Sequence, residues 1–237
     1  MSILFVSDIH LSAQRPTIVR AFLGFLGHRA QEAEALYILG DLFESWIGDD
    51  DPSELAISIK SALRQLSNKG VRVYIQRGNR DFTLGSRFAK ETGAKLLPDE
   101  YMLTYRHHCA LLMHGDSLCT DDIDYQRFRR KSRNPLYLWC LVHLPLTLRQ
   151  KIASNWREKS AAANSNKSSQ IMDVNTHAVT EVMSKHNAPV LIHGHTHRPA
   201  IHQLDNRQRI VLGDWDQNGW CLTLDNEGFK QDSFPLV

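Results

Sequence analysis

Five short polar motifs, each placed directly after a run of apolar residues, constrain the fold of this chain more than any other feature. In chain order they read SDIH, GDLFE, GNRD, HGD and HGHTH, and the runs before them span residues 3–7, 35–39, 71–76, 109–113 and 189–192. Short runs rich in Ile, Val, Leu and Tyr are typical of buried strands. In open α/β folds, ligands bind beyond the carboxyl ends of the strands. We therefore expect the five motifs to converge at one edge of a sheet.

Helical patterns separate the early apolar runs. The clearest helix is expected to begin after Asp51 as N-cap, with Pro52 at its first position and Glu54 completing a capping box, and to end at Gly70. Its apolar stripe consists of Leu55, Ile59, Leu63 and Leu66. Residues 173–187 show a second amphipathic pattern and are expected to form a helix. The side chains expected to face a core are those of Val174, Ala178, Val179, Val182 and Met183. Further strands are expected at residues 209–212 and 220–224, and strands that alternate with helices predict an α/β sandwich.

The length and composition fit one domain with an insert. A chain of 237 residues with 42% apolar content can bury one sizeable core, so we expect a single domain over residues 1–237. Between residues 118 and 173 the strand-like runs stop, and basic and aromatic residues become frequent. We interpret residues 118–173 as a helical cap insert within that domain.

Charge, cysteines and apolar runs argue against several classes of protein. A net charge of +2 is small for a nucleic-acid-binding domain, so we expect no nucleic-acid partner. The four cysteines form no close pair and no zinc-binding spacing, as is typical of reduced thiols in a cytosolic protein. The first apolar run stops at Asp8, too early for a signal peptide. The longest run, residues 136–148, is shorter than the roughly 20 residues that a transmembrane helix needs.

The polar motifs contain a set of metal-binding side chains. Asp8 and His10 lie two residues apart on a segment that we expect to be extended, so both side chains would point to one face. The other candidates, each after a predicted strand, are Asp41, Asn79, His114, His195 and His197. Two carboxylates, one amide and four imidazoles suit manganese, iron or zinc better than calcium. The set exceeds the needs of one ion and predicts a pair of metals that share a carboxylate.

This ordered set of motifs resembles that of the calcineurin-like metallophosphoesterases. The resemblance implies an α/β sandwich of two mixed sheets flanked by helices, with two Mn²⁺ ions per chain. It places Asp8, His10, Asp41 and His197 around one ion, and Asp41, Asn79, His114 and His195 around the other, with Asp41 as the bridge. A water activated by the metals would attack phosphorus. Asp81 and Asp116 fit either the orientation of ligands or the capping of loops, and His193 fits support of its loop better than metal binding.

Arg80 departs from the common pattern of that superfamily, in which histidine usually follows the Gly-Asn pair. Arginine stays protonated and cannot hand a proton to a leaving group. When a pyrophosphate is cleaved, however, the leaving group is a phosphate whose second pKa is about 6, and it can depart unprotonated. A planar cation would bind both phosphates there. Arg80 therefore favours pyrophosphate cleavage in a nucleotide-linked substrate.

The resemblance narrows when longer segments are compared. The segments ALYILGDLFESWIGDDD, GNRDF, HGDSLCTDD, NSNKS and LIHGHTHRPA are similar to those of the UDP-2,3-diacylglucosamine hydrolases of lipid A biosynthesis. The reaction implied is hydrolysis at the α-phosphorus of this nucleotide-linked glycolipid, giving UMP and 2,3-diacylglucosamine 1-phosphate (lipid X). The catalytic residues implied are Asn79, Arg80 and His195. The substrate contacts implied are Asn79, Arg80, Asp122, Ser160, Asn164, Lys167 and His195.

The insert itself combines many basic side chains with apolar and aromatic ones. This composition fits an anionic lipid or membrane surface, and we expect a monomer in peripheral contact with the cytoplasmic side of the inner membrane. The alternative is a helical hairpin that buries its apolar side on the domain. Two other functions stay open: a nuclease or nucleotide phosphodiesterase of the same fold, and a non-catalytic scaffold.

Overall fold

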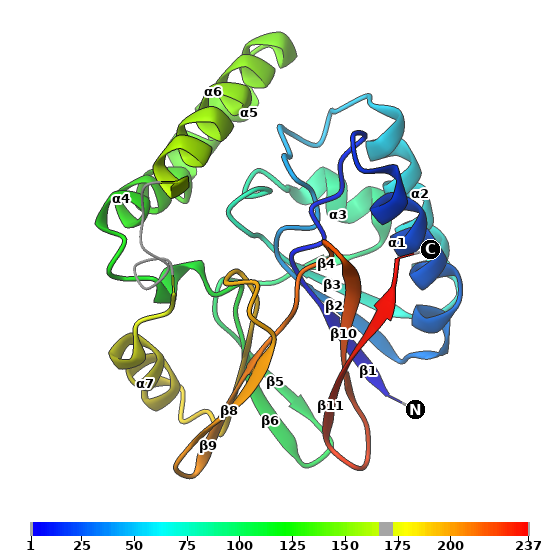
Figure 1. The fold of residues 1–237 in the computed structure, drawn as a ribbon. Coiled ribbons are helices and arrows are strands. Elements are labelled where there is room, and N and C mark those ends of the chain that lie inside the picture. The colour runs from blue at the N-terminus through cyan, green and yellow to red at the C-terminus, as the bar shows by residue number, and fades with distance from the viewer. Residues whose placement is uncertain (1, 166–172, 237) are drawn as a thin grey trace.

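The computed structural model describes residues 2–165 and 173–236, and the side chains of residues 159–165 also lie outside the description. Two β-sheets face each other at the centre of the molecule (Figure 1). The six-stranded sheet has the order β11 (Phe229–Pro235), β10 (Asn218–Leu224), β1 (Ile3–Val6), β2 (Ala35–Leu39), β3 (Arg72–Gln76), β4 (Lys95–Leu96). The five-stranded sheet has the order β5 (Tyr101–Tyr105), β6 (His108–Leu112), β7 (Val190–His193), β9 (Arg207–Val211), β8 (Ala200–Leu204).

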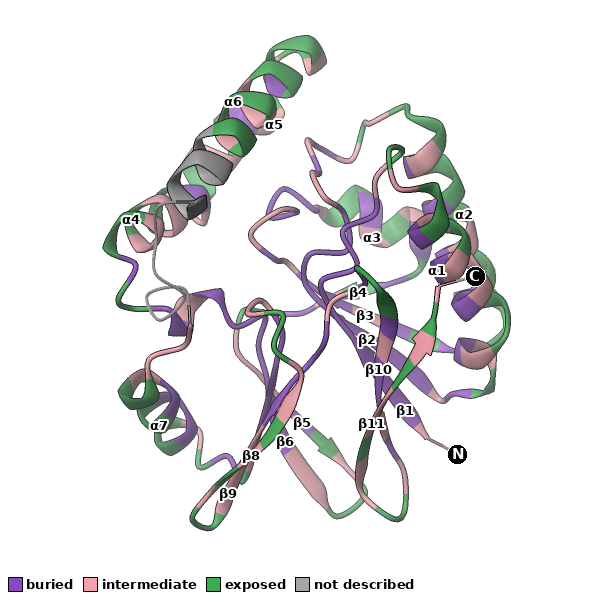
Figure 2. Cartoon of the chain, viewed as in Figure 1, coloured by how far each residue is buried: buried purple, intermediate pink, exposed green. Residues whose placement is uncertain are grey.

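Helices cover the outer faces of both sheets, which gives four layers. The helices α1 (Pro16–Gly27), α2 (Glu54–Asn68) and α3 (Ser86–Thr92) lie on the six-stranded sheet, and α7 (Thr176–Lys185) lies on the other. Three groups of buried apolar side chains fill the spaces between the layers. The middle group joins the sheets, with Phe5 and Leu39 meeting Leu112 and Ile192. Figure 2 shows the central strands as almost wholly buried. The α/β sandwich with two mixed sheets is confirmed.

The segment between β6 and α7 forms α4 (Ile123–Ser132), α5 (Pro135–Val142) and α6 (Leu146–Ser165). In Figure 1, the segment that carries α5 and α6 projects from the body of the molecule. Helices are therefore found where the sequence predicts them. Among the residues that the structure describes, no helix combines the length and apolar character that crossing a membrane requires.

Two local predictions are wrong. The N-cap of α2 is Ser53, whose hydroxyl accepts a hydrogen bond from Ala56 N, whereas Asp51 accepts one from Ser53 N and shapes the turn before the helix. The motifs also do not share one sheet. Those after β1, β2 and β3 leave the six-stranded sheet and those after β6 and β7 leave the five-stranded sheet, so the motifs converge at one end of the sandwich, between two sheets.

Candidate metal centre and substrate pocket

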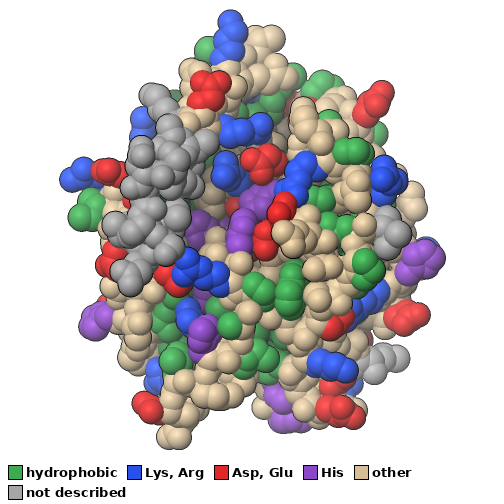
Figure 3. Space-filling view, in the orientation of Figure 1, with side chains coloured by type: hydrophobic (Ala, Val, Ile, Leu, Met, Phe, Trp, Pro, Cys, Tyr) green, Lys and Arg blue, Asp and Glu red, His purple; other side chains and the backbone are tan. Residues whose placement is uncertain are grey.

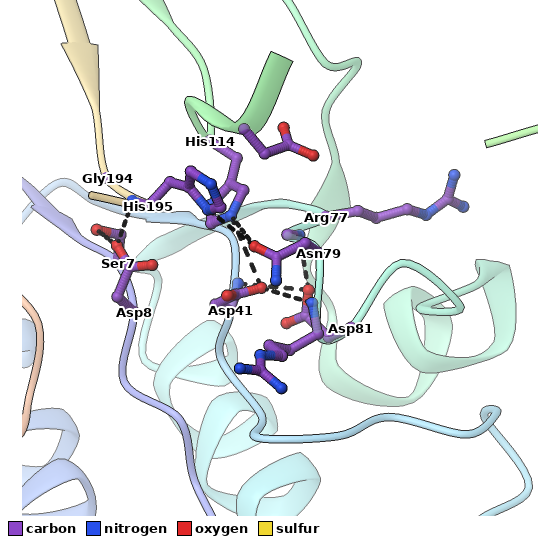
Figure 4. A network of polar contacts seen from close by, with 12 residues as sticks. Ser7, Asp8, Asp41, Arg77, Asn79, Asp81, His114, Gly194 and His195 are labelled. Carbon is purple, nitrogen blue, oxygen red and sulfur yellow. Dashed lines mark hydrogen bonds and ion pairs between the residues drawn. The ribbon is translucent and has the colours of Figure 1, made fainter. Parts of the chain in front are cut away.

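The predicted ligands gather where the strands of both sheets end. Asp8 and His10 follow β1, Asp41 follows β2 and Asn79 follows β3. His114 follows β6, and His195 and His197 follow β7. In Figure 3 histidine side chains line a hollow on this face, with acidic and basic side chains at its rim. The close view in Figure 4 shows Asp8, Asp41, Asn79, His114 and His195 turned towards a common centre.

Five of these ligands adopt a left-handed backbone conformation. The φ angles are 52° at Asp8, His10 and Asp41, 69° at His195 and 55° at His197. The expectation of an extended segment at Asp8 and His10 is therefore wrong, because each is a sharp bend after the strand. Such conformations are costly for non-glycine residues and collect at functional sites where surrounding contacts enforce them. Here backbone hydrogen bonds from Asp8 N to Gly40 O (3.1 Å) and from His10 N to Asp41 O (3.0 Å) enforce them.

Two groups of candidate metal ligands meet at Asp8. One group is Asp8, His10 and His197, and the other is Asp8, Asp41 and His114, with the ligand atoms of each within 4.8 Å of one another. Nε2 of His10 lies 3.2 Å from Nε2 of His197. Asp41 lies between the two groups, with Oδ2 4.0 Å from His10 Nε2 and Oδ1 3.8 Å from His114 Nε2. One carboxylate thus faces both positions, as a bridging ligand must.

Asn79 connects two histidines of the second position. Its Oδ1 lies 3.0 Å from Nε2 of His114 and 2.9 Å from Nδ1 of His195. These three side chains come from β3, β6 and β7 and therefore from both sheets. The arrangement brings together all the residues that the sequence predicts around the second ion.

The charge states of His10, His195, Asp8 and Asp41 fit cations. At His197, burial lowers the pKa but Asp8 and Asp214 raise it to about 9, so this imidazole must lose its proton when an ion binds. Burial lowers the pKa of His10 to about 3 and that of His195 to about 4, so both imidazoles are neutral and carry a free lone pair at neutral pH. Burial alone would raise the pKa of Asp8, but the nearby imidazoles of His197 and His114 hold that pKa well below the usual range. Burial raises the pKa of Asp41 to about 7. A buried carboxylate with a raised pKa is stabilised in its charged form by a cation beside it.

An orphaned polar atom supports the same conclusion. Oδ1 of Asp8 is buried and makes no hydrogen bond within residues 2–165 and 173–236. Buried polar atoms are almost always satisfied, so an unpaired carboxylate oxygen beside two histidines needs a positive partner. The mixed oxygen and nitrogen donors suit Mn²⁺, Fe²⁺ or Zn²⁺. The residues present therefore fit a pair of metal ions.

Asp81 holds the ligand loops together. Its carboxylate accepts hydrogen bonds from Gly78 N (2.7 Å), Leu42 N (2.8 Å) and Asp41 N (3.3 Å). The loops that carry Asp41 and Asn79 are thereby fixed to each other (Figure 4). Of the two roles that the sequence leaves open for Asp81, loop capping and ligand orientation, the structure combines both.

A pocket of about 450 Å³ opens beside the metal ligands. The metal side of the pocket contributes Glu44, Asn79 and Arg80. The apolar wall is formed largely by three aromatic rings, Phe82, Phe128 and Trp156, whose centroids lie 5.4–6.1 Å apart. Helices α4, α5 and α6 supply further lining, including Asp122 at the N-cap of α4, Tyr125, Leu141, Arg149 and Arg157.

Some of the predicted substrate-binding residues line this pocket. Asn79, Arg80 and Asp122 line it, and Asp122 also caps α4 by accepting a hydrogen bond from Tyr125 N. His195 is not among the lining residues, but its ring stacks on that of Tyr125, which is, with the ring centroids 5.9 Å apart. Ser160 and Asn164 lie on α6, but their side chains are outside the described part of the chain, and Lys167 lies outside it entirely.

Sequence reasoning misses several residues of the site. Glu44 belongs to the GDLFE motif but receives no role, although it lies 3.4 Å from His10 Nδ1 and 3.7 Å from Arg80 Nη1. Asp214, 3.4 Å from His197 Nδ1, is also missed. It follows β9, which runs parallel to β7, so the strand-end rule applied there would have found it.

Comparison with known proteins decides the family. The family model of the calcineurin-like phosphoesterases matches residues 1–199. The chain belongs to this family. Among relatives of this calcineurin-like phosphoesterase, a protein from Pseudomonas aeruginosa is 53% identical over 100% of both chains and carries the name UDP-2,3-diacylglucosamine hydrolase. A relative of the same name from Azotobacter vinelandii is 49% identical, again over 100% of both. The family resemblance predicted from the motifs is confirmed.

A solved structure described as a novel archaeal phosphodiesterase is similar in fold to this calcineurin-like phosphoesterase. The TM-score is 0.52 with 13% sequence identity, and the match covers 99% of this chain and 100% of that one. At this level of identity the likeness concerns the fold alone.

Proposed function

We propose that the protein hydrolyses the pyrophosphate bond of UDP-2,3-diacylglucosamine and releases UMP and 2,3-diacylglucosamine 1-phosphate. The observation that carries the proposal is the pocket, which joins Asn79 and Arg80 at one end to an aromatic wall. A substrate with a pyrophosphate and acyl chains needs both surfaces next to each other. The 53% identity to relatives named for this reaction supports the same substrate.

Arg80 and Asn79 are assigned to the phosphates. The backbone N–H of Arg80 donates to Asp41 Oδ1 at 2.8 Å, which fixes the start of its side chain beside the ligands. From there the guanidinium faces the pocket together with Arg157, and both lie 3.7 Å from Glu44. Because two guanidinium groups share the single negative charge of Glu44, one positive charge is left to interact with the pyrophosphate. The charge that develops on the departing phosphate is then stabilised without a proton donor.

The metal positions are assigned to two Mn²⁺ ions. Asp8, His10, Asp41 and His197 would hold one ion, and Asp41, Asn79, His114 and His195 the other. When bound, the ions supply Lewis-acid chemistry that lowers the pKa of a water and offsets phosphoryl charge. His195 and Asn79 lie where the second position meets the pocket, so both would also touch the substrate. The water oxygen joins the α-phosphorus, and the bond from that phosphorus to the bridging oxygen breaks.

Residues 118–173 are assigned to a cap over this site. Asp122, Ser160, Asn164 and Lys167 would contact the polar part of the substrate, and the aromatic wall would hold acyl chains. We assign the enzyme to the cytoplasmic face of the inner membrane as a monomer in peripheral contact. The membrane contact is supported by exposed Leu136 and Trp139 on α5, which follow the basic last turn of α4.

A hydrolysis in oxygen-18 water tests the proposal. The protein is supplied with Mn²⁺ and UDP-2,3-diacylglucosamine, and both products are analysed by mass spectrometry. The expected result is label in UMP and none in the 2,3-diacylglucosamine 1-phosphate. Cleavage of simple phosphodiesters or of polynucleotides without release of UMP would contradict this substrate and favour another phosphodiesterase. Failure to bind Mn²⁺ would favour a scaffold.

A further inference from the structure

Two carboxylates lie behind the histidines of one metal position. Oε2 of Glu44 is 3.4 Å from Nδ1 of His10, and Oδ2 of Asp214 is 3.4 Å from Nδ1 of His197. The opposite nitrogens of these two rings, their Nε2 atoms, lie 3.2 Å apart beside Asp8. Each imidazole is therefore placed between a carboxylate on one side and the candidate metal position on the other.

Backbone hydrogen bonds hold the segments of Glu44 and Asp214 against the segment that carries Asp8 and His10. Glu44 N donates to Leu11 O at 3.1 Å, directly after the loop of Asp8 and His10. Trp215 N donates to Asp8 O at 3.1 Å, which ties the loop of Asp214 to the same segment. Both side chains are about three-quarters buried, with exposed fractions of 27% for Glu44 and 23% for Asp214. The two acids are thus held within the site, unlike solvent-exposed carboxylates on the surface.

At the other position, His114 has a neutral partner behind its ring, because Nδ1 of His114 lies 2.9 Å from the carbonyl oxygen of Leu39. His195 differs, since its Nδ1 lies 2.9 Å from Oδ1 of the co-ligand Asn79 and so faces the metal position itself. Within the described residues, a carboxylate lies within 4 Å of the far ring nitrogen of both histidines at one position, whereas His114 has a carbonyl oxygen there. A carboxylate at one ring nitrogen fixes the tautomer and makes the other nitrogen a stronger ligand, more so than a neutral acceptor does.

We propose that Glu44 and Asp214 are positioning residues that make the position of Asp8, His10 and His197 the tighter of the two metal sites. With the ion bound, each acid would accept the Nδ1 proton of its histidine, from its present distance of 3.4 Å, and leave the Nε2 lone pair for the ion. The inference rests on the metal-dependent function proposed above. It adds an order of loading, in which the carboxylate-backed position fills first and the position of Asn79, His114 and His195 fills second.

Asp214 gives the cleaner test of the two. Oε1 of Glu44 also lies 3.7 Å from Arg80 Nη1 and from Arg157 Nε, so a change there disturbs the cations of the pocket as well. The matched control is Asp216, a carboxylate two residues further on, which pairs with Arg15 and is 59% exposed. Asp214→Asn and Asp216→Asn each remove one negative charge from the same loop.

Titration with Mn²⁺ alone, followed by electron paramagnetic resonance of the free ion, measures both sites without substrate. The wild-type chain is expected to bind two equivalents of unequal affinity. Asp214→Asn should weaken the tighter equivalent about 10–100-fold and leave the other within about threefold. Glu44→Gln should weaken the same equivalent, and Asp216→Asn should match the wild type. Equal affinities in the wild type, unchanged binding in both variants, or equal loss at both sites would each overturn the inference.

A second readout does not depend on the variants' stability. In wild-type protein loaded with diamagnetic Zn²⁺, nitrogen-15 NMR should find the Nδ1 protons of His10 and His197 in strong hydrogen bonds, further downfield than that of His114. Nδ1 protons of His10 and His197 that exchange freely with water would contradict the inference. The diphosphatase assay, run on the same wild-type preparation, separates the two proposals. If UMP is released but the two Mn²⁺ equivalents bind with equal affinity, the proposed order of loading is wrong and the proposed reaction stands.

Discussion

Arg80 differs chemically from the histidine that usually follows the Gly-Asn pair in this superfamily, and the difference can be tested at a single residue. Its side chain lies at the pocket, 28% exposed, while its backbone N–H is bound to Asp41. Arg80→His should therefore leave the metal ligands in place but remove a permanent cation from the phosphates. We expect kcat for UDP-2,3-diacylglucosamine to fall about 10²–10³-fold, as for loss of one electrostatic contact to a transition state.

The measurement is steady-state kinetics together with Mn²⁺ titration of the same variant. Arg20→His, on an exposed part of α1, is the matched control and should keep wild-type turnover. Undiminished turnover in Arg80→His would show that Arg80 does not bind the phosphates. Loss of Mn²⁺ binding would instead mean that the substitution disturbs Asp41.

Buried His193 is expected to add to the acid sensitivity of the metal-free protein, beside His10 and His195, whose pKa values are also lowered by burial. The side chain of His193 is 0% exposed, and burial lowers its pKa from 6.5 to about 3. Because the folded-state pKa is the lower one, the unfolded chain binds the proton more strongly between those values, and stability falls as the pH drops below 6.5. One such group contributes a slope of about 1.4 kcal/mol per pH unit.

Urea unfolding in EDTA at pH 7 and pH 5 measures this effect. The free energy of unfolding should decrease between those values in the wild type and decrease less in His193→Gln. His28→Gln, which replaces an exposed histidine, should keep the wild-type difference. An identical pH difference in His193→Gln would show that other groups cause the acid sensitivity.

At this scale the sequence predicts which residues meet but not how the backbone brings them together. Asp8, Asp41 and His197 are found from their place after strands, and the structure assembles them at one centre. Their left-handed φ angles could not be predicted, because aspartate and histidine adopt this conformation only where tertiary contacts enforce it. Glu44 and Asp214 were missed because a carboxylate that acts through a histidine leaves no spacing pattern of its own.

Helix α4 is joined to the metal-ligand loops by a network of charged groups. Arg133 Nη2 donates to the carbonyl oxygens of Arg77 and Gly78, each at 3.1 Å, immediately before Asn79. Buried Asp116, two residues after His114, accepts from Tyr125 Oη at 2.6 Å and from Arg129 Nε at 2.9 Å. Two of the loops that carry ligands are therefore held against one helix of the insert.

Removing Arg133 should loosen this connection. Arg133→Ala leaves two carbonyl groups without their charged donor, and bonds of this kind contribute roughly 1.5–3 kcal/mol each at most. We expect a loss of about 2 kcal/mol in unfolding free energy and a kcat at least tenfold lower, with KM for the substrate changed less. Arg130→Ala, on the exposed face of α4, is the control and should match the wild type. A stability loss with unchanged kcat would mean that Arg133 is structural only.

Element prediction succeeds for buried strands and fails for half-exposed ones. The run Ala35–Leu39 is apolar throughout and its predicted bounds match β2. The strands β5, β8 and β11 were not predicted, because each mixes buried or partly buried positions with exposed ones and so lacks a continuous apolar run. The N-cap of α2 was misplaced by two residues because Asp51 and Ser53 are both good caps, and sequence alone cannot choose between them.

The whole molecule presents two apolar surfaces on the insert, and the sequence could not separate them. Phe128, Leu141 and Trp156 line the pocket, whereas Leu136 and Trp139 are 71% and 60% exposed. Both surfaces belong to the same basic segment, and its composition does not say which apolar side chains face the pocket and which face outwards. From composition alone, one lipid-binding face is the simplest interpretation. Three-dimensional placement separates an inner wall from an outer face, and the proposed function assigns acyl chains to the first and the bilayer to the second.

One inner and one outer substitution distinguish these functions. Phe128→Ala should raise KM for the long-chain substrate in detergent about tenfold and affect a short-chain analogue less, because one large apolar contact is lost. Trp139→Ala should leave the detergent assay unchanged but weaken sedimentation with phosphatidylglycerol vesicles about tenfold, by the same reasoning at the outer face. Vesicles of phosphatidylcholine control for charge. If Trp139→Ala instead raised KM in detergent without changing vesicle binding, α5 would belong to the substrate pocket, and the membrane contact would have to lie elsewhere on the molecule.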